Sequence, residues 1–378
     1  MKPANRKTTL LEAAASNNPH GGCHKMIQGH HPASPINVAR KRQKRLRRIL
    51  YLLLILFIAA ICFFSLYRYI RPRINRHIRN SEYVQNHAHA YDFPAENNGW
   101  KKFGTSPVYG EGENIMFDPY CYVEDDTLKM LVSDRKNGAL ATVTSTDGVQ
   151  WNDYELLLSG ISQTWEDIVN RGCMIKHGDT YMLYYTGQHN GESHIGLAMS
   201  HDGNNFYRYE YNPILRPESN HEGASVMNPC VIYDKKSRLF KMWYSAGETY
   251  EPNIICYAES TDGINWVKRD QPVLEKGENE WEKDRIGGCQ VIQQSTGYIM
   301  YYIGYQNIDI ARICYAESQD GIHWKRPSSN LLLSPSEGCW DSCAVYKPSV
   351  VSWHGQEHLY YNGRNEQGEY IGLAVKPL

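Results

Sequence analysis

The sequence has few acidic residues near its N-terminus and few long apolar runs. Residues 1–91 contain 16 Lys and Arg but only two acids, Glu12 and Glu82, whereas residues 92–378 contain 24 Lys and Arg against 39 Asp and Glu. A basic leader therefore precedes an acidic body, although the formal net charge of the whole chain is −1. Because phosphate binding needs clustered Lys and Arg, the acidic body argues against nucleic acid as a partner. The shortage of apolar runs excludes a membrane protein with many spans.

Several chemical signatures are also missing. The sequence has no phosphate-binding Gly loop, no zinc-ligand spacing in the body and no Ser-His-Asp signature, so we expect neither a metal nor a cofactor. It has no Asn-X-Ser/Thr sequon, which favours a bacterial envelope protein over a glycosylated secretory one. Eight of the ten cysteines lie in the body, mostly on predicted strands, and only Cys339 and Cys343 are placed for a local disulfide.

One uncharged run of nineteen residues, Ile49–Tyr67, lies between Arg48 and Arg68. As a helix it would be roughly 28 Å long, close to the thickness of the bilayer core. Lys and Arg are more numerous before the run than after it, which predicts a cytoplasmic N-terminus and a body outside the membrane. We therefore expect a disordered basic tail over 1–48, a transmembrane helix over 49–67 and a basic juxtamembrane linker over 68–91.

The body, 92–378, repeats one motif. STDGVQW, SHDGNNF, STDGINW and SQDGIHW place their aspartates at Asp147, Asp202, Asp262 and Asp320, which are 55, 60 and 58 residues apart. Two segments of alternating apolar residues precede each motif, and Asp-Gly between strands is typical of a tight turn. Such a period predicts an all-β fold, a five-bladed β-propeller with four-stranded blades, in which the motif is a turn and not a site.

The predicted fifth blade lacks its outer strand at the C-terminal end of the chain. EHLYYNGR and YIGLAV repeat the second and third strands, and the chain ends soon afterwards at Leu378. The segment Asn97–Tyr109 resembles the residues that follow the other turns, such as Asp262–Leu274. We therefore expect Gly99–Tyr109 to pair beside Tyr370–Val375 and to close the ring.

The repeats IGLAMSHDGNNFYRYEYNPIL and WDSCAVYKPSVVSWHGQEHLYYNGR resemble the five-bladed propeller superfamily of glycoside hydrolase families 43 and 32. The resemblance covers the whole body. It implies a sugar bound at one mouth of the central tunnel and carboxylates from the first strands of early blades that act as acid and as base or nucleophile. Fold alone does not carry activity, so the matching positions have to be compared one by one.

One of the three family carboxylates is present at its matching position. Asp118 in FDPY stands where the family has its base or nucleophile. Blade 2 has Asn170, Arg171 and Cys173 where an Asp is expected, and blade 3 has Met227 at the position of the acid. Substitute acids lie a few residues upstream. Of these we select Glu222, which has no Trp beside it, and Asp167 as catalytic candidates with Asp118, although the recurring Trp-acid pairs are also typical of a structural element.

Polar and basic residues near the same predicted mouth form the candidate substrate-binding set. These residues are Arg171, His221, Asn228, Arg285, Lys347 and Arg364. Converging cations would suit an anionic glycan, such as one with a uronic acid or a phosphate. The sequence thus favours a membrane-anchored glycoside hydrolase acting on envelope or exported polysaccharide. A non-catalytic carbohydrate-binding propeller and a glycan-transferring enzyme of polysaccharide assembly remain as alternatives.

Overall fold

The computed structural model describes residues 40, 42–60, 83, 85–110, 116–250 and 252–378. The chain divides into two units, Met1–Arg76 and His77–Leu378, and every strand among the described residues lies in the second. In the first unit, residues 42–60 are helical. Among the described residues, no helix is both long and apolar enough to span a membrane. Residues 1–39 and 41 of the predicted tail, and residues 61–67 of the predicted transmembrane segment, lie outside the described part of the chain.

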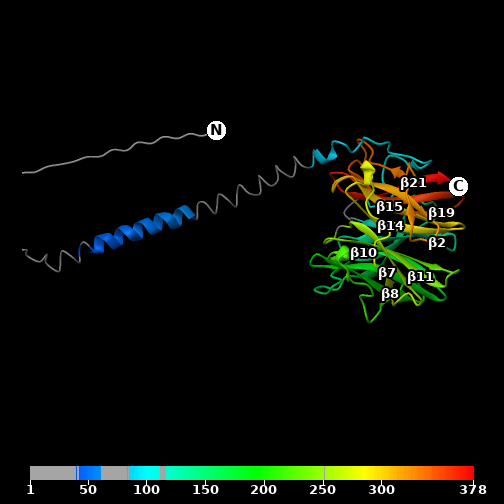
Figure 1. Cartoon of the computed structure of the whole chain (residues 1–378), viewed down its shortest axis with the longest axis horizontal. Helices are drawn as coiled ribbons and strands as arrows, with labels where there is room; N and C mark the ends of the chain where they lie inside the picture. The colour runs from blue at the N-terminus through cyan, green and yellow to red at the C-terminus, as the bar shows by residue number, and fades with distance from the viewer. Residues whose placement is uncertain (1–39, 41, 61–82, 84, 111–115, 251) are drawn as a thin grey trace, which may run out of the picture. The chain divides into compact units, whose positions relative to one another are not determined.

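Within the described residues, the strands of the second unit form four sheets, one of which joins two antiparallel groups through a parallel bridge between Ser225 and Ser193. The strands thus fall into five antiparallel groups, several strands of which are labelled in Figure 1. The first strands are β2 (Met116–Glu124), β6 (Ile168–His177), β10 (Ser225–Asp234), β14 (Arg285–Gln294) and β19 (Ala344–Trp353). The second strands are β3 (Thr127–Asp134), β7 (Thr180–His189), β11 (Leu239–Gly247), β15 (Gly297–Tyr305) and β20 (Gln356–Arg364). The third strands are β4 (Ala139–Ser145), β8 (Glu192–Ser200), β12 (Ile254–Ser260), β16 (Ala311–Ser318) and β21 (Glu369–Pro377).

The fourth strands are mostly short. They are β5 (Asn152–Ser159), β9 (Tyr207–Arg208), β13 (Val267–Lys268), β17 (Trp324–Lys325) and β1 (Lys101–Lys102). A further strand, β18 (Leu331–Leu333), pairs with β16, and two 3₁₀ helices, η1 (Asn220–Glu222) and η2 (Glu280–Glu282), precede β10 and β14. The core lies between neighbouring groups, where Met, Tyr and branched side chains of successive second strands pack together.

The predicted closure of the last group is confirmed. The chain ends directly after β21 (Figure 1), and β1 pairs antiparallel with it, Lys101 opposite Val375 and Lys102 opposite Ala374. A further bridge joins Tyr109 to Ile371. Backbone hydrogen bonds between segments from the two ends of the domain thereby cover what would otherwise be an open sheet edge.

The four repeated motifs are turns, as predicted. In the first, the Asp147 carboxylate accepts hydrogen bonds from the N–H groups of Val149 and Gln150 at 2.8 Å, and the Ser145 hydroxyl accepts one from Gly148 at 2.9 Å. The other three turns repeat these bonds. The Gly148 carbonyl also accepts a hydrogen bond from Tyr360 of the fifth group, so the turn docks on its neighbour.

A buried cluster of an acid, a tyrosine and a cation recurs in four of the groups. The acid precedes the first strand, the tyrosine lies on the second strand, and the cation lies on or next to the fourth. The clusters are Glu166–Tyr185–Arg208, Glu222–Tyr244–Lys268, Glu282–Tyr302–Arg326 and Asp341–Tyr361–Lys102. Each carboxylate receives a charge-assisted hydrogen bond from the cation, which compensates for its burial.

The fourth cluster depends on the closure, because its cation comes from β1. Lys102 Nζ lies 2.6 Å from Asp341 Oδ2, and it also donates to the carbonyl of Ser334 and the hydroxyl of Ser336. The Asp341 side chain is fully buried. The N-terminal strand is therefore held by a buried ion pair as well as by backbone hydrogen bonds.

Residues before the predicted boundary at position 92 also contact the strands. Asn86 Nδ2 donates to Asp309 Oδ2 at 2.6 Å, and Arg312 Nη2 donates to the carbonyls of His89 and Ala90 at 3.1 and 3.0 Å. Tyr83 lies 2.9 Å from the Cys343 sulfur. The described part of the predicted linker thus packs onto the domain. All eight described cysteines are free, so the local disulfide expected between Cys339 and Cys343 is absent.

We predict that Lys102→Met lowers the free energy of unfolding by about 3–5 kcal/mol, because it leaves the buried Asp341 carboxylate without its cation. The matched control is Lys101→Met on the same strand. Lys101 pairs with Glu96, but its side chain is 71% exposed, so we expect a loss below about 1 kcal/mol. Urea unfolding of both variants checks this. Equal losses would contradict the role given to the Lys102–Asp341 pair.

Candidate functional site

Each of the five first strands contains a β-bulge near its start. The register shifts between Phe117 and Tyr120 in β2, and at the matching place in β6, β10, β14 and β19. One residue of each bulge has a left-handed backbone, with φ between 52° and 56°. These residues are Asp118, Arg171, Asn228, Gly288 and Lys347. A non-glycine residue is seldom left-handed, and bulges that reorient side chains are frequent beside active sites.

Side chains of the preceding group hold most of these bulges. The N–H of Asp118 donates to Asn362 Oδ1 at 3.0 Å, that of Arg171 to Ser133 Oγ at 2.9 Å, and that of Asn228 to Thr186 Oγ1 at 3.0 Å. The N–H of Gly288 donates to Ser245 Oγ at 2.7 Å. These acceptors occupy matching positions on the second strands. The bulge residues are therefore presented by a hydrogen-bonded frame and not by mobile loops.

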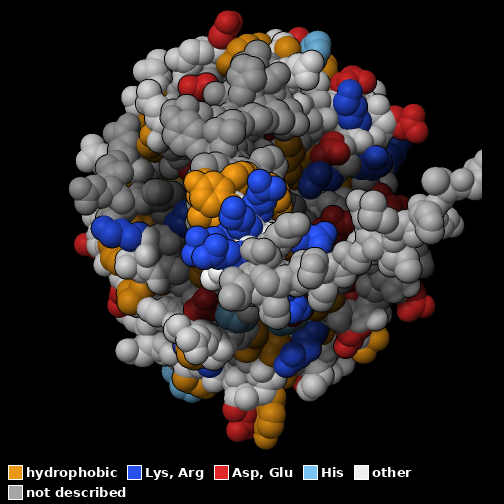
Figure 2. Space-filling model, turned by 90° about the vertical axis from the view of Figure 1, so that its left-hand side faces the viewer, with side chains coloured by type: hydrophobic (Ala, Val, Ile, Leu, Met, Phe, Trp, Pro, Cys, Tyr) orange, Lys and Arg blue, Asp and Glu red, His pale blue; other side chains and the backbone are white. Residues whose placement is uncertain are grey.

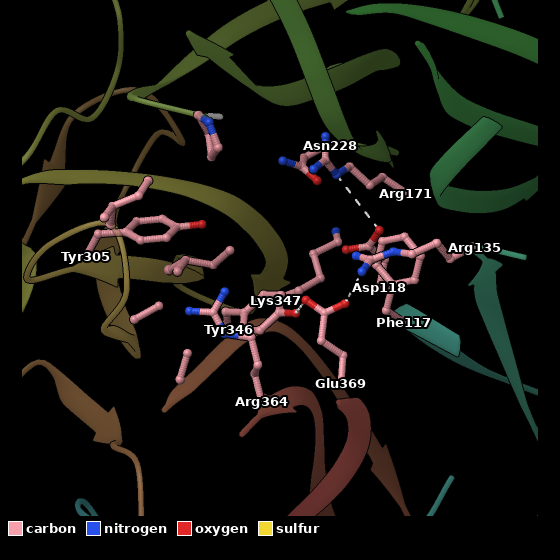
Figure 3. A pocket seen from close by; sticks show the side chains of 15 residues that line it. Phe117, Asp118, Arg135, Arg171, Asn228, Tyr305, Tyr346, Lys347, Arg364 and Glu369 are labelled. Atoms are coloured by element: carbon pink, nitrogen blue, oxygen red, sulfur yellow. Dashed lines mark hydrogen bonds and ion pairs between the residues drawn. The ribbon is translucent and has the colours of Figure 1, made fainter. Parts of the chain in front are cut away.

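A cavity of about 130 Å³ lies where the bulges meet (Figure 3). It gathers five of the nine residues selected from the sequence: Asp118, Arg171, Asn228, Lys347 and Arg364. Its other charged lining residues are Arg135 and Glu369, and its wall includes Phe117, Ile303, Tyr305, Ile308 and Tyr346. Side chains from three of the five groups, the first, the second and the last, therefore supply the charges of one cavity.

The Asp118 carboxyl is buried at the edge of this cavity, with the residue only 5% exposed. Ser133 Oγ donates to Asp118 Oδ2 at 3.2 Å, and Arg171 Nε lies 3.8 Å from the same oxygen. Burial raises the pKa of Asp118 above its ordinary value; Arg171, Lys347 and the Ser133 hydrogen bond oppose the rise, and Glu369 adds to it. A carboxyl that keeps its proton more readily than usual suits proton donation.

Glu369 is a second carboxyl of the cavity, and the sequence analysis missed it. It lies at the start of β21, where its two oxygens meet Arg135 Nη1 at 2.6 Å and the Tyr346 hydroxyl at 2.6 Å. Burial and Glu369 together raise the pKa of Tyr346, so this hydroxyl remains a donor. No repeated motif marks Glu369. Only the position of the last group beside the first brings it to Asp118.

Basic residues outnumber acids in the cavity, although residues 92–378 as a whole contain 24 Lys and Arg against 39 Asp and Glu. Figure 2 shows Asp and Glu side chains scattered around the periphery of one face, with Lys and Arg between them. The cavity has four cations, Arg135, Arg171, Lys347 and Arg364, against the two carboxyls. A site with this excess of positive charge favours a ligand that carries negative charge or develops it.

Glu222, which the sequence predicts as the acid, does not line the cavity. Its side chain is 1% exposed and forms the second acid–tyrosine–cation cluster, with Lys268 Nζ at 2.9 Å and the Tyr244 hydroxyl at 2.8 Å. Burial alone would raise the pKa of Glu222, but hydrogen bonds from Lys268, the Glu218 N–H and Tyr244 outweigh it and lower the pKa. A carboxylate held ionised in this way is a poor proton donor.

Three other selected residues also lie outside the cavity lining. Asp167 is exposed, accepts a hydrogen bond from the Gln163 N–H and lies 3.6 Å from His189 Nδ1. His221 contacts the Ser219 hydroxyl at 3.1 Å. Arg285 pairs with its neighbour Asp284 at 2.7 Å. These residues were selected because they precede or begin a first strand. None of them is the bulge residue of that strand.

We predict that Asp118→Asn is more stable than the native protein at pH 7. Because the folded-state pKa of Asp118 is raised, ionisation above the unfolded-state pKa costs the native state stability, and that cost is absent in the amide. Asn also tolerates the left-handed backbone. The gain should shrink below about pH 4, where the unfolded carboxyl is protonated as well. Thermal unfolding at pH 7 and pH 4 measures this. A variant less stable at pH 7 would show that Asp118 is stabilised as the anion.

Sequence comparisons find glycan-active enzymes among the relatives. Residues 131–286 match the model of the glycosyl hydrolases family 32 N-terminal domain. An uncharacterized protein of Mycobacterium tuberculosis is 29% identical over 220 residues, which cover 55% of this chain and 71% of the relative. A 1,2-beta-oligomannan phosphorylase of Thermoanaerobacter sp. is 34% identical over 125 residues, covering 30% of this chain and 41% of that enzyme.

Solved structures agree over a longer part of the chain. A glycoside hydrolase superposes with a TM-score of 0.61 at 18% identity, covering 73% of this chain and 92% of that structure. A thermostable family-43 glycoside hydrolase gives 0.56 at 17%, covering 69% and 89%. A beta-1,2-mannobiose phosphorylase from Listeria innocua gives 0.57 at 13%, covering 76% and 93%. This chain therefore has the all-β, propeller-like fold of these glycoside hydrolases and mannoside phosphorylases.

Proposed function

We propose that this protein is a five-bladed propeller that hydrolyses glycosidic bonds at the cavity containing Asp118. The observation that carries the proposal is the meeting of Asp118 and Glu369 in one cavity, in different environments. Burial raises the pKa of Asp118, whereas Glu369 is ion-paired with Arg135. Glycoside hydrolysis uses two carboxyl groups in different environments, one of which is protonated and acts as the acid while the other is ionised and acts as the base or nucleophile.

The environments assign the two roles. Asp118, which retains its proton more readily than usual, is placed to protonate the leaving-group oxygen. Glu369, next to Arg135, is placed as the carboxylate that activates water or attacks the sugar. The family resemblance gives Asp118 the opposite role, of base or nucleophile. The raised pKa and the presence of Glu369 favour the acid role in this chain.

The matched family and relatives support a glycan as the substrate class. Residues 131–286 match a glycosyl hydrolase domain, and one relative acts, by its name, on 1,2-beta-oligomannan. We further propose that residues 49–67 anchor the protein in a bacterial cell membrane, with the propeller outside and the basic tail inside. The support for this is the uncharged run between Arg48 and Arg68 and the larger number of cations before it.

A glycan-transferring activity is the second candidate, favoured by the excess of cations around the carboxyls. Transfer to phosphate or another acceptor would use the same proton donor and would not need a water-activating carboxylate. Products formed in water alone support hydrolysis. Products that form only when inorganic phosphate or another acceptor is added would favour transfer.

We predict that Asp118→Asn lowers turnover about 10²–10⁴-fold, the usual contribution of a positioned proton donor, while sugar binding is retained. Asp167→Asn is the matched control, because it changes an exposed carboxyl outside the cavity and should leave turnover unchanged. Release of reducing ends from a panel of oligosaccharides measures turnover, and calorimetry measures binding. Unchanged turnover in Asp118→Asn would reject the catalytic role, and binding without turnover in the native protein would favour a carbohydrate-binding module.

A further inference from the structure

Within the residues that the structure describes, two of the four cations in the cavity have no carboxylate partner. Arg135 pairs with Glu369 at 2.6 Å, and Arg171 lies 3.8 Å from Asp118. Among the described residues, no carboxylate oxygen lies within 4.0 Å of the Lys347 ammonium or the Arg364 guanidinium. Within the described part of the chain, the ion pairs of the cavity therefore leave two positive charges without a carboxylate.

Lys347 is the more unusual of the two. The residue is only 4% exposed and sits on the left-handed bulge of β19, which fixes where its side chain starts. In Figure 3 its amine points into the space between Asp118 and Asn228. Burying an ammonium group is costly unless an anion or several acceptors compensate it. A ligand with negative charge would supply that compensation.

Arg364 and Asn228 complete the surroundings. Arg364 Nη2 donates to the Asp309 carbonyl at 2.9 Å, which holds the guanidinium at the wall and leaves its other N–H groups for a ligand. Asn228 is 3% exposed, and its Oδ1 has no hydrogen-bond partner in the described part of the chain. This amide provides a buried acceptor for a hydroxyl, and in Figure 3 it lies on the Lys347 side of the cavity, across from Arg364.

We infer that Lys347 and Arg364 form a subsite for a negatively charged group carried by the glycan itself, with Asn228 binding a neighbouring sugar hydroxyl. The substrate class is thus an acidic glycan, with a carboxylate or a phosphate on the sugar that enters the cavity. Both groups present oxygens that accept paired hydrogen bonds from a guanidinium. This inference rests on the proposed function, because it requires the cavity to bind a glycan.

Calorimetry with the full-length protein and four probes tests the subsite. The probes are methyl glucuronide, glucose 6-phosphate, neutral methyl glucoside and inorganic phosphate. We expect at least one acidic sugar to bind 10-fold or more tightly than methyl glucoside, as one or two charge-assisted hydrogen bonds would give. Which acidic sugar binds identifies the charged group. Equal binding of neutral and acidic sugars, or tighter binding of inorganic phosphate than of both acidic sugars, would overturn the inference.

Substitutions of the two cations test whether they are responsible for the preference for acidic sugars. Lys347→Met and Arg364→Met should each weaken acidic-sugar binding 10-fold or more and change methyl glucoside binding less than twofold. Lys347→Arg should retain the preference, because it keeps the charge. Lys325→Met is the control, since Lys325 is exposed and outside the cavity lining. Equal losses for acidic and neutral sugars in Lys347→Met would overturn the subsite.

The outcomes for the subsite and for hydrolysis are separable. Acidic-sugar binding that depends on Lys347, without cleavage of any acidic glycan, would support the subsite and contradict the proposed hydrolase. Cleavage of neutral glycans that depends on Asp118, with no preference for acidic ones, would support the hydrolase and contradict the subsite.

Discussion

The left-handed bulge in each first strand is the constraint on which the candidate site depends. In four of the five strand groups it directs a side chain toward a common cavity, whereas the fifth bulge residue, Gly288, has no side chain. In four of the five cases, a side chain of the preceding group accepts the N–H of the bulge residue. The backbone geometry of the bulge is therefore nearly the same in all five first strands. The residue at the bulge differs from strand to strand: Asp118, Arg171, Asn228, Gly288 and Lys347. Such a combination of constant backbone geometry and variable side chains is expected when different residues serve stability and function. The hydrogen-bonded strands stabilise the fold, and the bulge residues can then vary with the ligand that they bind.

The acid–tyrosine–cation clusters show the opposite pattern, since both their geometry and their chemistry recur. Each buries a carboxylate against the second strand and ties it to the outer strand, which explains why acids precede several first strands. In the last group the cation comes from the N-terminal segment, so the same cluster that stabilises the other groups also closes the domain. That closure places Glu369 of β21 next to the first group and so completes the carboxyl pair of the cavity.

Much of this architecture could be predicted from the sequence, because turns and strand alternation repeat at a regular spacing. The closure by Gly99–Tyr109 and the cavity positions of Asp118, Arg171 and Lys347 follow from aligning the repeats. Glu222 was selected as the acid because it lacks the neighbouring Trp. The aligned tyrosines Tyr185, Tyr244, Tyr302 and Tyr361 place it instead in the recurring acid–tyrosine–cation series. Glu369 could not be found in this way, because no repeat marks it and its role arises from contact between the two ends of the domain.

The central claim is that the cavity at the bulges is where a glycan reacts. A crystal structure of Asp118→Asn with an acidic oligosaccharide bound tests it most directly. The account predicts a glycosidic oxygen within hydrogen-bonding distance of residue 118, the Glu369 carboxylate on the other side of the scissile bond, and the charged substituent at Lys347 and Arg364. A sugar bound elsewhere on the domain, with the cavity at Asp118 free of it, would contradict the account.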